Sequence, residues 1–323
     1  MNLPRRAAAL ALVATVGTGC AVTPPQPPGL PASPTAPAGP TAQPTPSASA
    51  TAAAEALDLT RPGAASELVA DLMAEADADE AIMVTVTASE ASVTVLEDDQ
   101  PRTWAWRDGR IQQVPSDITY VAQREFDPAD FALGDVGALF RAARSVSGSN
   151  QGQSLQVVDY SAGLVSMSVS TVPESRPVFF KPDGTLLPTL DFTSAWGLEQ
   201  GYADAVGDRR VATAIGFGSA LGVHLDGLQS ADGAYQRRQR TARTPVIVTP
   251  RSEATLRRPF DAALVDPAKV WGVLERLADQ GHFSLADPWT CVVDDRDQVG
   301  VPRMHFTVAD RSFTTTLDGR VID

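Results

Sequence analysis

Residues 126–146 read FDPADFALGDVGALFRAARSV, and residues 260–280 read FDAALVDPAKVWGVLERLADQ. The Phe-Asp pair that opens the first stretch returns 134 positions later. In both stretches the apolar residues then fall at i, i+3, i+4 and i+7, which places them on one face of a helix. They are Val136, Leu139, Phe140 and Ala143 in the first stretch, and Val270, Val273, Leu274 and Leu277 in the second. The repetition predicts two copies of one folding unit.

The match extends upstream of these stretches. An apolar helix face at residues 68, 69 and 72 corresponds to residues 202, 203 and 206 at an offset of 134. The strand-like segment 92–95 resembles segment 222–225 at an offset of 130, and Trp104 then falls on Tyr235. The drifting offset indicates small loop insertions between equivalent elements.

Each copy predicts a helix, an antiparallel meander, a second helix and further strands. In the first copy a helix is expected over about residues 58–76, and strands are expected over about residues 81–87, 91–97, 102–114, 155–158, 164–172 and 177–181. In the second copy helices are expected from about Ser194 and from Asp266-Pro267, because Pro is favoured in a first helical turn. Asp-Gly pairs suit tight turns, and they stand at residues 108–109, 183–184, 232–233 and 318–319.

Helices segregated from antiparallel strands define an α+β fold. We therefore expect two tandem homologous domains, residues 57–189 and 190–323, each an antiparallel sheet covered by helices. About 270 residues remain after the N-terminal segments, which also favours two domains over one.

The N-terminus has the features of a secretory signal peptide in residues 1–19. Arg5 and Arg6 precede an apolar run over residues 7–16, and small residues lead to Cys20. The run is too short to cross a bilayer. Gly19 and Cys20 resemble the lipobox of bacterial lipoproteins, although Gly17 departs from the leucine that is usual there. The resemblance implies cleavage before Cys20 and a diacylglycerol on its sulfur, with two acyl chains that would hold the protein stably on a membrane.

A low-complexity segment follows the expected lipid site. Residues 20–56 consist almost entirely of Pro, Ala, Thr, Ser and Gly, with no charge before Glu55. Such a segment has little to bury, so we expect a disordered, semi-rigid spacer. The predicted location is the extracytoplasmic face of the cell membrane, with a lipid anchor.

The charge is distributed unevenly along the chain. Residues 55–190 carry 21 acids and 9 bases, whereas residues 191–323 carry 18 acids and 15 bases. The acidic first half argues against nucleic acid as a partner. Arginine also outnumbers lysine by 24 to 2, which is typical of GC-rich genomes.

Four segments in order carry a resemblance to uncharacterised secreted lipoproteins of actinobacteria. They are Val84-Thr85-Val86, the hairpin segment 104–109 (WAWRDG), segment 133–139 (LGDVGAL) and segment 178–184 (VFFKPDG). The resemblance covers most of the first copy and, more faintly, the second. It implies a location and a fold, and it brings no family activity.

Chemical motifs are scarce. His224, His282 and His305 lack metal-ligand spacing, and we expect no metal and no cofactor. The glycine-rich segment 216–222 lacks the dinucleotide pattern and predicts a hairpin loop. Cys291 is expected to be a buried small hydrophobe. The acidic groups Glu97-Asp98-Asp99 and Asp294-Asp295-Arg296-Asp297 are expected to be solvated turns rather than calcium sites.

The most notable surface feature expected from the sequence is basic. Its members are Arg237, Arg238, Arg240, Arg243, Arg257 and Arg258. Guanidinium groups pair well with phosphate, so this patch is a candidate for anion contact. It equally suits a surface that docks the two lobes, and alternation along a strand would divide its members between two faces.

The leading interpretation is a lipid-anchored envelope module that binds a protein, lipid or glycan partner and has no catalytic activity. One alternative is a carrier of a lipid or glycolipid in a cavity between the sheets. The other is a hydrolase whose site the sequence does not reveal.

Overall fold

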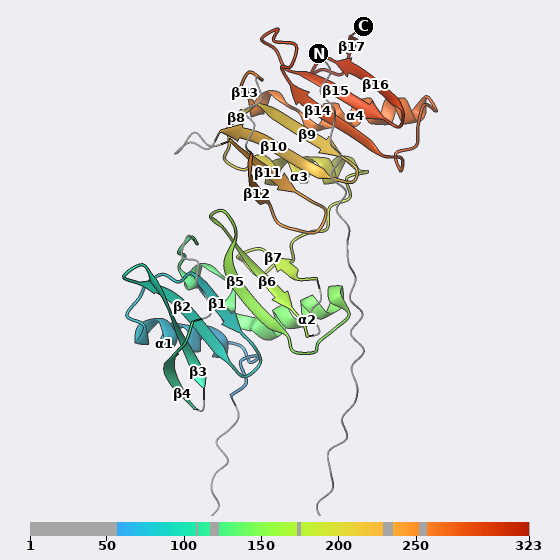
Figure 1. Ribbon diagram of the computed structural model, residues 1–323. Coiled ribbons are helices and arrows are strands. Elements are labelled where there is room, and N and C mark those ends of the chain that lie inside the picture. Colours follow the sequence, from blue (N-terminus) through green and yellow to red (C-terminus); the bar gives the residue numbers. More distant parts are fainter. Residues whose placement is uncertain are drawn as a thin grey trace, which may run out of the picture. The chain divides into compact units, whose positions relative to one another are not determined.

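The computed structural model describes residues 57–107, 109–116, 123–172, 176–228, 235–251 and 257–322. These residues form two lobes, each with one large antiparallel sheet and a hydrophobic core (Figure 1). The first core spans Leu59 to Phe180, and the second spans Leu190 to Val308. The predicted signal peptide, Gly19, Cys20 and the linker lie outside the described residues, as do Asp108 and the Asp232-Gly233 pair.

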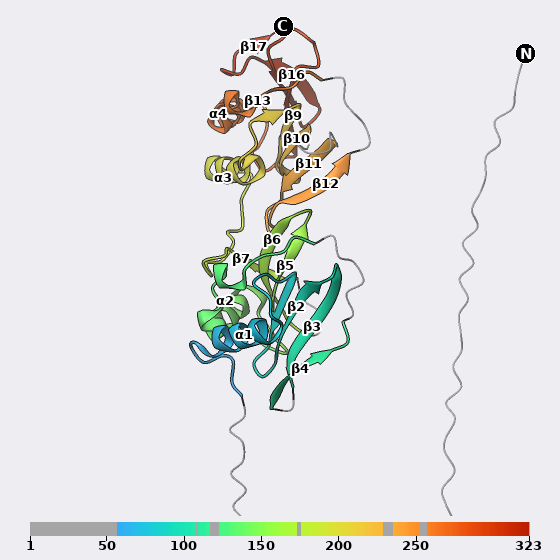
Figure 2. The same ribbon diagram turned by 90° about the vertical axis from the view of Figure 1, so that its left-hand side faces the viewer.

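The first lobe contains a seven-stranded sheet in the order β4-β3-β2-β1-β5-β6-β7. Helices α1 (Ala64–Glu75) and α2 (Val136–Ser147) cover one face of it (Figure 2), with the short 3-10 helices η1 (Pro128–Asp130) and η2 (Leu133–Asp135) between them in sequence. The strands are β1 (Met83–Val86), β2 (Ala91–Glu97), β3 (Gln100–Arg107), β4 (Arg110–Val114), β5 (Ser154–Ser161), β6 (Leu164–Ser170) and β7 (Val178–Phe180).

The second lobe contains an eight-stranded sheet in the order β12-β11-β10-β9-β14-β15-β16-β17. Helices α3 (Ala195–Val206) and α4 (Pro267–Asp279) cover one face, and η3 (Ala262–Leu264) precedes α4. The strands are β9 (Ala214–Gly218), β10 (Gly222–Leu228), β11 (Tyr235–Arg240), β12 (Ile247–Arg251), β14 (Trp289–Asp294), β15 (Arg303–Val308), β16 (Arg311–Thr315) and β17 (Val321–Ile322), with β8 (Val211–Ala212) and β13 (Phe260–Asp261) forming a separate pair. None of the helices in the described ranges is long and apolar enough to span a bilayer.

The two sheets share one topology. If β9, β14 and β15 are matched to β1, β5 and β6, the first seven strands follow the same order in both lobes. Each lobe also places its helices on a single face of the sheet (Figure 2). The predicted α+β class with two tandem copies is therefore confirmed.

Side-chain caps fix the starts of the second helix in each copy. The Asp135 carboxylate accepts a hydrogen bond from the Ala138 N–H at 2.7 Å, and the Asp266 carboxylate accepts one from the Ala268 N–H at 2.9 Å. Such caps satisfy amide groups that have no partner inside the helix. The predicted helix start at Asp266-Pro267 is confirmed.

The first helix of the chain begins later than predicted. Asp58 does not start α1; its carboxylate accepts hydrogen bonds from the Thr60 N–H at 3.0 Å and from the Thr60 hydroxyl at 2.6 Å. This Asp-x-Thr turn competes with helix formation. Pro62 and Gly63, the latter at a φ of 85°, then precede the helix.

The glycine-rich segment is only partly a hairpin loop. Gly216 and Gly218 belong to β9, and the turn comprises residues 219–221. A side chain at Gly216 would collide with the ring of His224 on the neighbouring strand, since a Cβ there would lie 1.9 Å from His224 Cε1. Glycine therefore serves the packing of a histidine here, not a turn.

Equivalent hydrogen bonds correct the register between the copies. The Ile82 N–H donates to the Thr94 carbonyl, and the Thr213 N–H donates to the Asp226 carbonyl. Thr94 therefore corresponds to Asp226, an offset of 132 rather than the predicted 130. The predicted offset was therefore wrong by two residues. Because strand alternation has a period of two, it still assigned every side chain to the correct face.

The first helices also shift in register. Residues 191–193 form a second Asp-x-Thr turn, in which the Asp191 carboxylate accepts bonds from the Thr193 N–H and hydroxyl, as in residues 58–60. The offset is therefore 133, not 134. It pairs Val69 with Tyr202, whereas the sequence alignment had paired Leu68 with that tyrosine.

Candidate functional site

Two regions of the structure concentrate chemistry or space. The first is the face of the second sheet that α3 and α4 do not cover, which we call the open face. In a strand successive side chains alternate between faces. Leu225 and Val293 point into the core, and Asp226 and Asp294 consequently point to the open face on either side of β9.

Asp226 and Arg237 form one charged pair on the open face. The Asp226 side chain is 7% exposed, and its carboxylate accepts bonds from Arg237 Nε at 2.7 Å and Nη2 at 2.8 Å. Burial raises the pKa of Asp226, but hydrogen bonds from Arg237 and nearby positive charge outweigh it and hold the pKa below its usual value. The geometry is the bidentate one in which guanidinium and carboxylate bind most strongly.

Asp294 is the centre of a larger cluster. Its side chain is 0% exposed, and it accepts bonds from Arg296 Nε at 2.8 Å and Nη2 at 2.9 Å. Arg257 Nη1 lies 3.0 Å from its second oxygen, and His305 Nε2 lies 3.5 Å from the first. His305 Nδ1 is in turn 3.1 Å from the Thr314 hydroxyl.

The carboxylate, imidazole and hydroxyl of this cluster follow the order of a hydrolase triad. Two guanidinium groups hold the carboxylate, however, and their combined positive charge exceeds its negative charge. Burial lowers the pKa of His305, the positive charge of Arg296 adds to this, and Asp294 opposes it. The cluster is thus a charged network that ties residues 257 and 296 to the sheet.

This cluster corrects one prediction. Asp294 and Asp295 were expected in a solvated turn, but both are buried. Asp294 continues the alternation of β14, and Asp295 accepts bonds from the backbone N–H groups of Val299 and Gly300. The other acidic group, Glu97-Asp98-Asp99, is an exposed turn as predicted.

The six arginines singled out in the sequence do not share one surface. Arg237 and Arg257 reach the open face, where each holds an aspartate. Arg238 and Arg240 lie on the helix-covered face, and Arg238 Nε donates to the Ala205 carbonyl at 2.9 Å. Alternation along β11 separates the two sets. Arg243 and Arg258 are exposed.

The first lobe has uncharged residues at the corresponding positions. Thr94 and Thr103 occupy the places of Asp226 and Arg237, and their hydroxyls bond to each other at 2.9 Å. The charged pair on the open face is therefore a property of the second copy alone.

Cys291 and His282, the remaining candidate residues from the sequence, do not belong to the charged pairs of the open face. Cys291 is buried in β14, which confirms its expected packing role, and burial raises the pKa of its thiol. His282 is exposed beyond the end of α4. Within the described ranges, no group of three or more His, Cys, Asp or Glu side chains is placed to hold a metal ion.

His224 gives the second lobe a pH dependence that can be measured. Burial, together with the positive charges of Arg237, Arg251 and Arg257, lowers its pKa to about 4, although Asp226 opposes the shift. The unfolded chain then binds the proton more tightly, so stability falls as the pH drops from 6.5 towards 4. We expect His224 to contribute a loss of about 2 kcal/mol between pH 7 and pH 5.

Urea unfolding of the wild type and of His224→Gln at both pH values measures this contribution. The variant should lose most of the pH dependence and keep the part due to His305, which has the same sign. His282→Gln is the control and should behave like the wild type. Equal pH slopes in wild type and His224→Gln would contradict the assignment.

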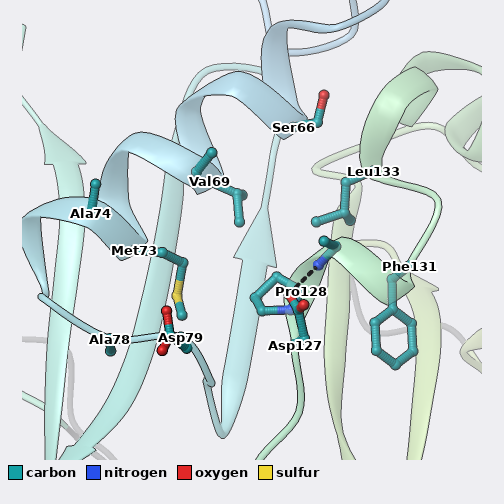
Figure 3. Close-up of a pocket in the computed structure, with 12 residues that line it drawn as sticks. Ser66, Val69, Met73, Ala74, Ala78, Asp79, Asp127, Pro128, Phe131 and Leu133 are labelled. Atoms are coloured by element: carbon teal, nitrogen blue, oxygen red, sulfur yellow. Dashed lines mark hydrogen bonds between the residues drawn. The ribbon is translucent and has the colours of Figure 1, made fainter.

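The second region is a groove in the first lobe between α1 and the segment that contains η1 (Figure 3). Its volume is about 700 Å³, within the usual range of ligand pockets. The lining is apolar except for three residues, and it comprises Ser66, Val69, Ala70, Met73, Ala74, Ala78, Asp79, Asp127, Pro128, Ala129, Phe131 and Leu133. Figure 3 shows Val69 and Met73 on one wall and Pro128 and Leu133 on the other.

The second copy fills the corresponding space with a tyrosine. Val69 corresponds to Tyr202, whose ring stacks on Phe217 and whose hydroxyl donates to the Ala262 carbonyl at 2.6 Å. Ala262 corresponds to Pro128 at the offset of 134 shared by the two Phe-Asp pairs. The first lobe has the smaller Val69 at this position, and the groove lies beside it. The groove could not be predicted from the sequence alignment, in which Tyr202 is paired with Leu68.

A scan against protein-family models finds no matching family, and a search of curated proteins finds no match.

Proposed function

We propose that this chain is a binding module held on the outer face of the cell membrane by a lipid on Cys20, and that the groove of the first lobe receives a protein partner. The observation that carries the proposal is the replacement of Tyr202 by Val69 at equivalent positions of the two copies. In the second lobe the chain's own Tyr202 takes the place of a ligand, whereas in the first lobe the groove remains available to one.

The tether is proposed from the sequence of the N-terminus. Cys20→Ala should release the protein into the medium or leave its precursor uncleaved, because the acyl chains and the cleavage step both require the cysteine. Membrane fractionation with immunoblotting measures the outcome. Wild-type protein that is already free and unlipidated would remove the anchor from the proposal and leave export alone.

The lining of the groove favours binding over catalysis. The exposed Ala70 and Ala74 and the half-buried Phe131 offer apolar surface that gains from being removed from water. The groove lies between a helix and a loop of one lobe, not between the sheets as the lipid-carrier alternative expects. A partner that inserts one side chain suits this form better than an acyl chain.

Photo-crosslinking in cells tests the proposal. A photoreactive amino acid at Ala74, which lines the groove and is exposed, should give a discrete adduct. The same residue at Ser145, exposed on α2, is the matched control and should give none. Val69→Tyr should abolish the Ala74 adduct by filling the groove. Failure to form an adduct, or an adduct that survives Val69→Tyr, would refute the proposal.

A further inference from the structure

We infer that the groove accepts a tyrosine side chain from a basic polypeptide segment of the partner, an inference that rests on the proposed function. The second lobe supplies the template for the occupant. There the phenol of Tyr202 lies against the core and reaches the carbonyl of the residue after the repeated Phe-Asp pair. An incoming tyrosine would reproduce the hydroxyl contact between two chains, while its ring would meet the lining of the groove in place of Phe217, whose counterpart is Val86.

The first lobe keeps the acceptor that this phenol requires. Ala262 accepts bonds from the Tyr202 hydroxyl and from the Val265 N–H at 3.0 Å. Pro128, its counterpart, accepts the matching backbone bond from the Phe131 N–H at 3.2 Å. A carbonyl oxygen has two lone pairs, so Pro128 can accept a hydroxyl in the same way as Ala262. A site of this kind discriminates between tyrosine and phenylalanine.

The walls also match an aromatic ring. Val69, on the α1 wall, is 2% exposed, and Met73 on the same wall supplies a thioether, a group that packs well against ring edges. Leu133 and Pro128 close the opposite wall (Figure 3). Tyrosine combines a large apolar body with one polar tip, which is the combination that this lining presents.

The charge around the groove selects the flanking residues. Asp79 and Asp127 are exposed members of the lining. They belong to the half of the chain that carries 21 acids and 9 bases. Arginine or lysine beside the tyrosine would complement this charge, whereas acidic neighbours would be repelled.

Titration of the full mature chain with acetyl-Gly-Arg-Tyr-Arg-Gly-amide tests the inference by calorimetry. Replacing Tyr by Phe in the peptide should weaken binding about fivefold, through one lost hydrogen bond. Replacing Tyr by Ala should weaken it at least thirtyfold, through loss of the anchor. Replacing both Arg by Glu should weaken it about tenfold.

Variants of the protein locate the site. Val69→Tyr should abolish binding, and an unchanged or raised melting temperature would show that the filled lobe is folded. Tyr202→Val makes the reciprocal change in the second lobe and should leave binding at the first lobe intact. Asp79→Asn with Asp127→Asn should reduce the preference for Arg over Glu without changing the Tyr-to-Phe ratio.

The outcomes separate the two levels of the proposal. If crosslinking at Ala74 is lost in Val69→Tyr while the peptides show no preference for tyrosine, the identity of the occupant is wrong and the groove remains a binding site. If neither crosslinking nor titration responds to Val69→Tyr, both proposals are refuted. Binding of the Tyr peptide that persists in Val69→Tyr also overturns the inference.

Discussion

Arg240→Ala should lower the free energy of unfolding of the second lobe by about 3–5 kcal/mol, since it breaks a buried ion pair by removing one partner. The Arg240 side chain is 1% exposed, and its Nε lies 2.8 Å from Asp204 of α3. Its other nitrogens donate to the carbonyls of Pro188, Thr241 and Thr244. One guanidinium thereby joins α3, the β11–β12 turn and the segment that leads into the second lobe.

The loss comes mainly from the groups that stay behind. Without Arg240, three carbonyls and the Asp204 carboxylate lose a donor. Asp204 is 26% exposed and keeps a bond from Gln200 Nε2, so the desolvation cost falls mainly on the carbonyls. Hydrogen exchange resolved along the chain should show loss of protection in the second lobe and little change in the first. Arg243→Ala, at an exposed position three residues away, is the control and should be close to neutral. Equal protection in both variants would show that Arg240 is dispensable.

Asp294→Ala should destabilise the second lobe by about 3 kcal/mol, since it leaves two partly exposed guanidinium groups without their carboxylate. The substitution leaves Arg257 and Arg296 without the carboxylate that holds them to the sheet. Asp294→Asn removes the charge but keeps an oxygen acceptor, so its effect should be intermediate. Denaturant unfolding followed by a signal specific to the second lobe measures both.

A surface pair in the same segment provides the control for Asp294. Asp297 bonds to Arg303 at 3.1 Å, with both side chains partly exposed. Exposed pairs contribute about 0–1 kcal/mol, so Asp297→Ala should be nearly silent. If the Asp294 and Asp297 variants lose the same stability, the buried cluster does not hold the open face together.

The duplication and the α+β class could be predicted from the sequence because they depend on patterns that survive divergence. Helical spacing at Val136, Leu139 and Phe140, and the Asp-Gly turns, are local signals with strict geometric causes. The predicted bounds of helices were less accurate where a polar side chain could either join a helix or bond to the nearby backbone. Asp58 was expected to be part of a helix, and it forms an Asp-x-Thr turn instead.

The groove and the buried charges were beyond sequence reasoning for different reasons. The groove was related to the difference in side-chain volume between Val69 and Tyr202 at equivalent positions, so a one-residue error in the alignment of the two copies hid it. The two Asp-x-Thr turns were the signal that would have corrected this register. Asp294 was misplaced because runs of acidic residues usually lie in solvent. Its burial depends on Arg257, which lies 37 positions away in sequence.

The tyrosine of α3 has an evolutionary consequence. Two copies of a fold in one gene are inherited and expressed together, so selection acts on the pair rather than on either member. A copy that retains a complete core through Tyr202 can sustain the folded yield of the chain. The first copy can then diverge at Val69 and acquire a binding specificity. In a protein with a single copy, the same change would lower the solubility of the whole chain. This division of labour predicts that relatives of the chain vary more around the first helix of the first copy than around that of the second.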